Sequence, residues 1–271
     1  MNEEDRKIMF KKTFDTVANG YDNSALRFFP ESANHLSSLL NLKGYEHVLD
    51  IATGTGNVAL RLAEDLPQGQ VTGIDFSKGM LAQANNKAGK LNLNNISFIE
   101  MDMQAIEFPD NHFDTAVSAF SIFFVPDMEK QLNHISSKVK PDGKIIITNF
   151  FENTFSPLVG KFLDHLEKFN VEIPPMTWKQ IATEEKCISL FNSANLKDIS
   201  SQMKNCGYYL KDASDWWHII WNGGFRGLVS QLSNEDLDRF KTEHLKEVQE
   251  LSSEKGIWLE MNILFTMGTK L

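Results

Sequence analysis

The sequence is poor in cysteine, in positive charge and in long apolar runs. Only two cysteines, Cys187 and Cys206, occur among its 271 residues, which excludes a disulfide scaffold and gives no metal-ligand spacing, so no metal is expected. We interpret both as reduced, half-buried side chains of a cytoplasmic protein. No apolar run approaches the roughly 20 residues that span a bilayer, so we expect no membrane span.

The formal net charge of −9 indicates that nucleic acid is not the partner, because proteins that bind it usually carry a basic face. The acidic start, residues 1–5, lacks the basic and apolar regions of a signal peptide. A hydrophobic fraction of 42% is enough for one well-buried domain, with room for an appended lobe. Twenty phenylalanines and five tryptophans indicate an aromatic-rich core or pocket.

The most informative stretch is Val48–Gly56, which has the pattern of a buried strand that ends at an acid and enters a glycine turn. A helical pattern follows at once. Such a turn brings backbone N–H groups and a helix N-terminus close to a polar ligand, and glycine lets the ligand approach the backbone. The stretch therefore predicts a site for a nucleotide-type cofactor.

Strand and helix patterns alternate from residue 45 to 150. We expect strands at 48–53, 71–75, 96–102, 113–121 and 144–150, and helices at 55–66, 77–91 and 127–138. A turn at Pro141–Gly143 precedes the fifth strand. This alternation predicts an α/β fold with a parallel sheet, helices on both faces and a ligand at the carboxyl ends of the strands.

The flanking segments have other patterns. Residues 4–40 look helical with an interruption at 20–22, and residues 151–195 look mostly helical. We interpret 151–195 as a helical insertion over the sheet edge. A strand region at 196–210, a helix at 234–252 and a last strand at 257–268 complete the chain.

The glycine turn alone leaves the cofactor open. Gly54-x-Gly56-x-x-Ala59 matches the dinucleotide fingerprint, and Asp75 ends the second strand where an acid would hold ribose hydroxyls, which also fits NAD. Asp50, however, would repel a pyrophosphate and suits an ammonium group. Asp102 and Met103 end the third strand, where they could meet an adenine. No second nucleotide-binding half follows residue 150.

Four motifs in order resemble the class I S-adenosylmethionine-dependent methyltransferases, particularly the branch that includes the ubiquinone and menaquinone C-methyltransferases. They are Asp50–Gly56, which resembles D-x-G-x-G-x-G, then Ile74–Leu81, Phe113–Ser118 and Val139–Lys144. Phe14–Ala18 with Tyr21-Asp22 resembles the amino-terminal helix of the quinone branch. Ala52 stands in place of the first glycine of the motif, and Asp142 replaces a turn glycine.

The resemblance implies a three-layer, Rossmann-like fold with a mostly parallel, doubly wound, seven-stranded sheet. It further implies a helical cap at 1–40, a methyltransferase domain at 41–271 with 151–195 over the acceptor side, and S-adenosyl-L-methionine as cofactor. The residues expected around that cofactor are Tyr21, Asp50, Ala52, Gly54, Gly56, Asp75, Phe76, Met80, Asp102, Met103, Ser118 and Phe123.

Methyl transfer from a sulfonium needs few catalytic groups, and we assign no general base, although His134, His165 and His218 are candidates. The acceptor is expected to be a small lipophilic or aromatic molecule, and the atom methylated (C, O or N) stays open, as does the oligomeric state. The acceptor pocket is expected among aromatic side chains that could equally be core: Trp217, Trp221, Phe151, Phe155, Phe162 and Phe169. An NAD-dependent oxidoreductase and a non-catalytic S-adenosylmethionine-binding protein remain alternatives.

Overall fold

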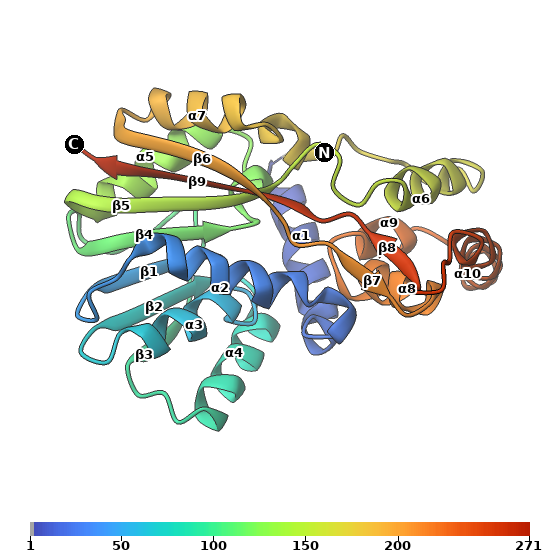
Figure 1. Ribbon diagram of the computed structural model, residues 1–271, viewed down its shortest axis with the longest axis horizontal. Coiled ribbons are helices and arrows are strands. Elements are labelled where there is room, and N and C mark those ends of the chain that lie inside the picture. Colours follow the sequence, from blue (N-terminus) through green and yellow to red (C-terminus); the bar gives the residue numbers. More distant parts are fainter. Residues whose placement is uncertain (1–2) are drawn as a thin grey trace.

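A seven-stranded sheet organises the computed structural model, which describes residues 3–271 (Figure 1). The strand order is β3-β2-β1-β4-β5-β9-β6, and only β9 runs antiparallel to its neighbours. The strands are β1 (His47–Ile51), β2 (Gln70–Asp75), β3 (Ile96–Glu100), β4 (Phe113–Ala119), β5 (Val139–Phe150), β6 (Leu196–Asn205) and β9 (Asn262–Lys270). This confirms the mostly parallel α/β sheet that the alternating pattern predicted.

Helices cover both faces of the sheet. On one face lie α2 (Phe28–Leu40), α3 (Asn57–Asp65) and α4 (Lys78–Lys90), and on the other lie α5 (Met128–Lys138) and α7 (Glu184–Ser193). Side-chain caps fix where these helices begin: Ser77 Oγ accepts from Met80 N–H at 3.1 Å, and Asp127 Oδ1 accepts from Lys130 N–H at 2.9 Å. The strand order reverses between β1 and β4, the point at which such sheets bind ligands beyond their carboxyl ends.

A helical lobe stands beyond that edge of the sheet, at the right of Figure 1. It contains α6 (Leu158–Glu167), α8 (Ala213–Asn222), α9 (Arg226–Val229), α10 (Asn234–Gln249) and the pair β7 (Tyr208–Leu210) and β8 (Ile257–Leu259). Within 151–195, α6 packs on α10 in this lobe, whereas α7 packs on β6 and β9, so the two helices of that segment belong to different layers.

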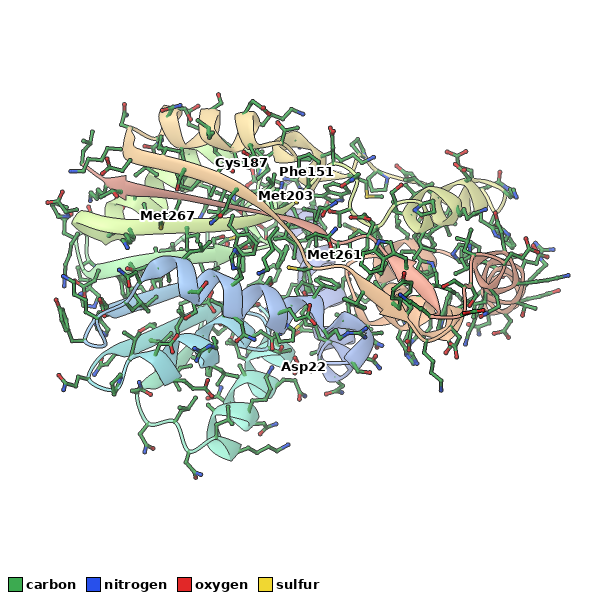
Figure 2. The ribbon with its side chains drawn as sticks, in the orientation of Figure 1. Asp22, Phe151, Cys187, Met203, Met261 and Met267 are labelled. Carbon is green, nitrogen blue, oxygen red and sulfur yellow. The ribbon has the colours of Figure 1, made fainter. Side chains whose placement is uncertain are left out.

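The expected strands 196–210 and 257–268 are each divided, contrary to the sequence pattern. Both divide at the same level, where Cys206 N–H donates to Met261 O at 2.7 Å and the Asn205 amide donates to Glu260 and Asn262. The paired chains thus leave the main sheet together and re-pair as β7–β8 in the lobe. Figure 2 labels Met261 at this junction. In 257–267 every second residue is apolar straight through the bend, so the pattern of that segment did not indicate a division.

Strand β5 also differs from expectation, because it begins at Val139 and includes the predicted turn at 141–143. Val139 pairs with Phe113 on β4, and the register then shifts before Thr115 pairs with Lys144. Asp142 adopts a left-handed φ of 60° in this bulge. Both cysteines are free and buried rather than half-buried. No helix within residues 3–271 is long and apolar enough to cross a membrane.

The amino-terminal segment forms α1 (Glu3–Val17), two short 3₁₀ turns at Ala18–Gly20 and Ser24–Leu26, and then α2. Helix α1 buries only Val17 completely. Its contacts run to α4, to α9 and to the turn that follows it, so it spans from the sheet layer towards the lobe.

Candidate functional site

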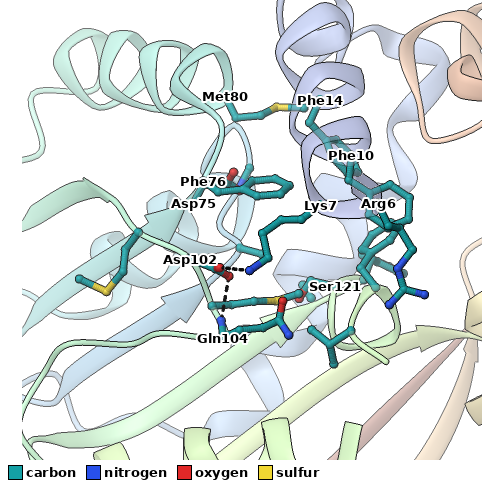
Figure 3. Close-up of a pocket in the computed structure, with 18 of the residues that line it drawn as sticks. Arg6, Lys7, Phe10, Phe14, Asp75, Phe76, Met80, Asp102, Gln104 and Ser121 are labelled. Atoms are coloured by element: carbon teal, nitrogen blue, oxygen red, sulfur yellow. Dashed lines mark hydrogen bonds and ion pairs between the residues drawn. The ribbon is translucent and has the colours of Figure 1, made fainter. Parts of the chain in front are cut away.

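A pocket lies at the carboxyl end of the parallel strands and contains about 820 Å³ of empty space, part of which is open to solvent (Figure 3). Helix α1 forms one wall. The β1–α3 turn, the end of β2, the segment after β3 and the segment after β4 form the others. Its lining residues are Glu3, Arg6, Lys7, Phe10, Phe14, Tyr21, Ala52, Gly54, Asp75, Phe76, Met80, Met101, Asp102, Met103, Gln104, Ala119, Phe120, Ser121, Phe124 and Val125.

Two glycines and an alanine give the β1–α3 turn its shape. Ala52, Gly54 and Gly56 all have left-handed φ values, 55°, 57° and 83°. A Cβ added at Gly54 would meet no atom within 4 Å, because that position opens into the pocket, whereas one at Gly56 would lie 3.1 Å from Ala84 Cβ. Gly54 therefore leaves room for a ligand, and Gly56 lets α3 and α4 pack closely. The alanine at 52 holds a conformation that glycine adopts at lower cost.

Asp75 is the buried carboxylate at the centre of the pocket wall. Its Oδ2 accepts from Gly54 N–H at 2.9 Å and its Oδ1 accepts from Ser77 N–H at 2.8 Å. Burial raises the pKa of Asp75 to about 6, although these backbone donors favour the charged form. A carboxylate that ties together two turns in this way has its remaining lone pairs at the pocket.

Asp50 lies beneath the turn rather than on the pocket wall, with 1% of its surface exposed. Its Oδ2 accepts from the Thr53 hydroxyl at 2.5 Å, and burial raises its pKa to about 7. Asp75 adds to that rise through like-charge repulsion. Two carboxylates of raised pKa beneath one pocket favour a cationic ligand, because a positive charge stabilises both ionised forms.

Asp102 has both oxygens engaged. Oδ2 lies 2.6 Å from Lys7 Nζ, and Oδ1 accepts from Gln104 N–H at 2.9 Å, as the dashed lines in Figure 3 show. The side chains of Lys7 and Asp102 are 29% and 28% exposed. The α1 helix thus brings a cation to the carboxylate that the sequence assigned to an adenine amino group.

Aromatic side chains of α1 close the outer side of the pocket. The Phe10 and Phe14 rings contact Phe124 edge-on, with ring centroids 4.9 and 5.6 Å apart, and Phe14 also meets Phe76 and Tyr21. No pattern in the sequence predicted a site role for Phe10 or Phe14. The spacing of Phe10 and Phe14 shows that they share a helix face, but periodicity does not tell which surface that face covers.

Eight of the twelve residues expected around the cofactor line this pocket: Tyr21, Ala52, Gly54, Asp75, Phe76, Met80, Asp102 and Met103. The other four, Asp50, Gly56, Ser118 and Phe123, lie behind the wall. Ser118 Oγ pairs with Ser121 Oγ at 2.6 Å, and Phe123 is 3% exposed. These positions bring the expected residues together at one edge, and their contacts with a ligand stay a prediction.

The candidate base residues lie elsewhere. His134 Nε2 accepts from Ile106 N–H at 3.0 Å, His165 is buried in the helical lobe, and His218 is exposed on α8. None of them lines the pocket.

The aromatic residues considered for the acceptor do not line the pocket either. Phe155, Phe162 and Trp216 pack together in the core of the helical lobe, and Trp217 stacks on Trp221 with ring centroids 5.6 Å apart. The guanidinium carbon of Arg226 lies 3.1 Å from the centroid of the Trp221 ring. These aromatic contacts fit a core that anchors the lobe.

Within residues 3–271, one group of possible metal ligands stands out, His165, His244 and Glu247, whose ligand atoms lie within 4.8 Å of one another. Trp216 Nε1–H donates to His244 Nε2 at 2.9 Å. Indole nitrogen is only a donor, so His244 Nε2 is unprotonated and the proton of the neutral ring is on Nδ1. A protonated Nδ1 cannot ligate, and the chemistry of this group does not fit a metal ion.

Comparison with known proteins gives the geometry a context. Residues 48–143 match the protein family described as "Methyltransferase domain". The chain is 29% identical over 213 residues to aklanonic acid methyltransferase DauC of Streptomyces sp. strain C5, a match that covers 77% of this chain and 95% of that protein. It is 27% identical over 201 residues to demethylmenaquinone methyltransferase of Listeria welshimeri, covering 67% of this chain and 83% of that protein.

A solved structure shows the same fold. The YcgJ protein of Bacillus subtilis superposes with a TM-score of 0.58 at 19% identity and covers 89% of this chain and 98% of its own. The family match spans β1 to the β4–β5 bulge, the part of the chain that supplies Gly54, Asp75 and Asp102.

Proposed function

The chain is a class I S-adenosylmethionine-dependent methyltransferase of the quinone-methyltransferase-like kind, and we propose that its methyl acceptor is a small lipophilic or aromatic molecule. The observation that carries the proposal is the pocket at the strand ends, which joins carboxylates and a glycine turn on one side to an aromatic wall on the other. Two relatives are named as methyltransferases of aklanonic acid and of demethylmenaquinone, and these names support an acceptor of this kind.

The pocket residues fit the cofactor. The open position at Gly54 leaves space against the backbone, and the buried carboxylates of Asp50 and Asp75 suit a cationic donor. We assign Asp75 to the ribose hydroxyls and Asp50, through the turn, to the ammonium group. Asp102 and the Met103 backbone would meet the adenine, Phe76 and Met80 its faces, and Tyr21 the methionine end.

Bound S-adenosylmethionine supplies a methyl group already activated on a sulfonium sulfur. The protein's own part is to hold the acceptor in line with that methyl and to exclude water. Phe10, Phe120 and Phe124 form the apolar wall that excludes water. Ser118 and Phe123 lie behind this wall. We place the enzyme in the cytoplasm, because both cysteines are free, and expect no nucleic-acid partner at a net charge of −9.

Calorimetry with the purified protein tests the cofactor and the reaction class. We expect S-adenosylmethionine and S-adenosylhomocysteine to bind and NADH not to bind, with Gly54→Val as a control that fills the open position. NADH binding without S-adenosylmethionine binding would support the oxidoreductase alternative. Incubation with methyl-labelled S-adenosylmethionine and a host extract then tests transfer. Binding without any labelled small molecule would favour a non-catalytic role.

A further inference from the structure

Lys87, in the last turn of α4, joins segments that are far apart in the chain. Its ammonium donates to Asp22 Oδ1 at 2.9 Å, to Asn57 Oδ1 at 3.1 Å and to Thr55 Oγ1 at 3.2 Å. An ammonium has three N–H donors, so each of them has an acceptor here. Asp22 belongs to the segment between α1 and α2, where Figure 2 labels it, whereas Thr55 is in the β1–α3 turn and Asn57 begins α3.

The acceptors of Lys87 are also bonded to one another. The Thr55 hydroxyl donates to Asp22 Oδ1 at 2.8 Å, so one carboxylate oxygen accepts from both the hydroxyl and the ammonium. Thr55 is 1% exposed, whereas the side chains of Lys87 and Asp22 are 26% and 36% exposed. A buried hydroxyl therefore lies beneath a partly exposed ion pair. We call Asp22, Thr55, Asn57 and Lys87 the Lys87 network.

Two members of the Lys87 network directly follow residues of the pocket wall. Tyr21 precedes Asp22 and Gly54 precedes Thr55, and both Tyr21 and Gly54 line the pocket. Lys87 does not line it. Because one peptide unit joins each wall residue to its neighbour, a shift of Asp22 or Thr55 moves the wall as well. Lys87 therefore controls, from outside the pocket, how far apart two of its walls lie.

Helix α4 also holds the amino-terminal segment through contacts that involve no residue of the glycine turn. Gln83 Nε2 donates to Asn19 Oδ1 at 2.8 Å, and Ala18 packs on Met80. Gln83 is one helical turn before Lys87, so the two side chains share a face of α4. Loss of Lys87 would thus leave the segment on α4 but remove the ammonium that ties it to the turn.

We propose that Lys87 is a positioning residue for the methionine part of the cofactor. This inference rests on the roles proposed above, in which Tyr21 meets the methionine end and Asp50 acts on the ammonium group through the β1–α3 turn. The Lys87 network holds the segment of Tyr21 against that turn before a ligand arrives. A wall that is already in place lowers the ordering cost of binding.

Calorimetry with two ligands tests this role, because S-adenosylhomocysteine carries the amino-acid part and adenosine lacks it. We expect Lys87→Met to weaken S-adenosylhomocysteine binding about 5- to 30-fold, since hydrogen bonds to a partly exposed charged group are lost. We expect adenosine binding to change by less than about twofold, because Asp75 and Asp102 follow β2 and β3 outside the Lys87 network. Equal weakening of both ligands would indicate a general loosening and overturn the proposal, as would unchanged binding of S-adenosylhomocysteine.

Matched variants separate Lys87 from the rest of α4. Lys87→Arg keeps the charge and should recover part of the loss. Lys90→Met removes a charge at an exposed site of the same helix, and Gln83→Met removes the bond to Asn19. Both should bind S-adenosylhomocysteine with wild-type affinity. A loss in either control equal to that in Lys87→Met would refute a specific role for Lys87.

Asp22→Ala breaks the same ion pair from the other side and keeps Lys87, so it decides the question even where Lys87→Met does not fold. We expect it to reproduce the selective loss of S-adenosylhomocysteine binding, and wild-type affinity in this variant would exclude the proposal. The wild-type protein separates this inference from the function on which it rests. A wild type that does not bind S-adenosylhomocysteine would contradict the cofactor site itself, whereas wild-type binding without a selective loss in the variants would count against Lys87 alone.

Discussion

Lys7 and Asp102 lie 95 positions apart in the chain, yet Lys7 Nζ is 2.6 Å from Asp102 Oδ2, and this ion pair attaches the amino-terminal half of α1 to the segment after β3. Lys11 makes a second such pair with Glu100 at 2.9 Å. Asp15 Oδ1, near the other end of the helix, accepts from the Ser77 hydroxyl and from Gly79 N–H. The helix that closes the pocket is thus held by polar contacts as well as by the aromatic contacts of Phe10 and Phe14.

Removing the Lys7 ion pair should loosen α1 without unfolding the protein. We expect Lys7→Met to lower hydrogen-exchange protection of residues 6–14 by a factor of about 1.4 to 5, because a partly exposed ion pair contributes about 0.2–1 kcal/mol. Peptide-level exchange measured by mass spectrometry checks this. Lys12→Met is the matched control. Equal protection in the wild type and Lys7→Met would show that the aromatic contacts alone hold the helix.

The carboxylate of Asp75 should determine cofactor affinity. We expect Asp75→Ala to weaken S-adenosylmethionine binding by about 1–3 kcal/mol, since buried charged hydrogen bonds are lost. Titration calorimetry measures this, and Asp238→Ala on the exposed face of α10 is the control. Because Asp75 also caps Gly54 and Ser77, the melting temperature is measured in parallel. A folded Asp75→Ala variant with wild-type affinity would refute the ribose assignment.

Cofactor binding should strengthen as pH rises from about 5 to 7.5. Burial raises the pKa of Asp50 to about 7 and of Asp75 to about 6, so both are mostly protonated at the lower pH. A cationic ligand favours the ionised forms, so binding releases protons, and affinity rises with pH in this window. Calorimetry in buffers of different ionisation enthalpy detects the released protons. Asp50→Asn should abolish the rise in cofactor affinity above pH 6. A wild-type affinity that does not change with pH would contradict the assignment.

The two turn glycines should respond differently to alanine. Gly54→Ala places a methyl in open pocket space, so we expect a stability loss of about 1 kcal/mol, the cost of a left-handed alanine, but at least tenfold weaker cofactor binding. Gly56→Ala places its methyl 3.1 Å from Ala84 Cβ and 3.2 Å from Phe98 Cζ, so we expect about 2–3 kcal/mol of lost stability. Urea unfolding and calorimetry separate the two effects. The reverse ranking in either measurement would place the ligand on the other side of the turn.

Acid should destabilise the helical lobe through His244. Burial lowers the pKa of this imidazole to about 4, below its unfolded value near 6.5, so the unfolded chain binds more protons. Stability due to neutral His244 is therefore present above pH 6.5 and is lost as pH falls towards 4, by up to about 3 kcal/mol.

Urea unfolding at several pH values checks the His244 prediction. His244→Phe combined with Trp216→Phe removes the titrating ring and its donor together, which avoids an unpaired indole N–H. That pair should flatten the profile between pH 6.5 and 4, whereas His218→Gln at an exposed site should not. A profile unchanged in the double variant would assign the acid sensitivity to other groups.

The features that depend on neighbours in the chain could be predicted from the residues alone. The buried strand Val48–Ile51, the glycine turn and the acids at three strand ends are local patterns, and adjacent parallel strands necessarily bring their carboxyl ends to one edge. Eight of the expected cofactor residues accordingly line one pocket. Their order along the chain was sufficient to indicate where they would meet.

The elements that close that pocket could not be predicted in this way, because they come from distant parts of the chain. Helix α1 brings Arg6, Lys7 and Phe10 to the pocket, although Lys7 and Asp102 are 95 positions apart in the chain. The bend at Met261 directs the chain from the helical lobe into the main sheet. Periodicity tells which face of a helix is buried but not which distant surface will cover it, because that choice depends on the summed packing of the whole fold.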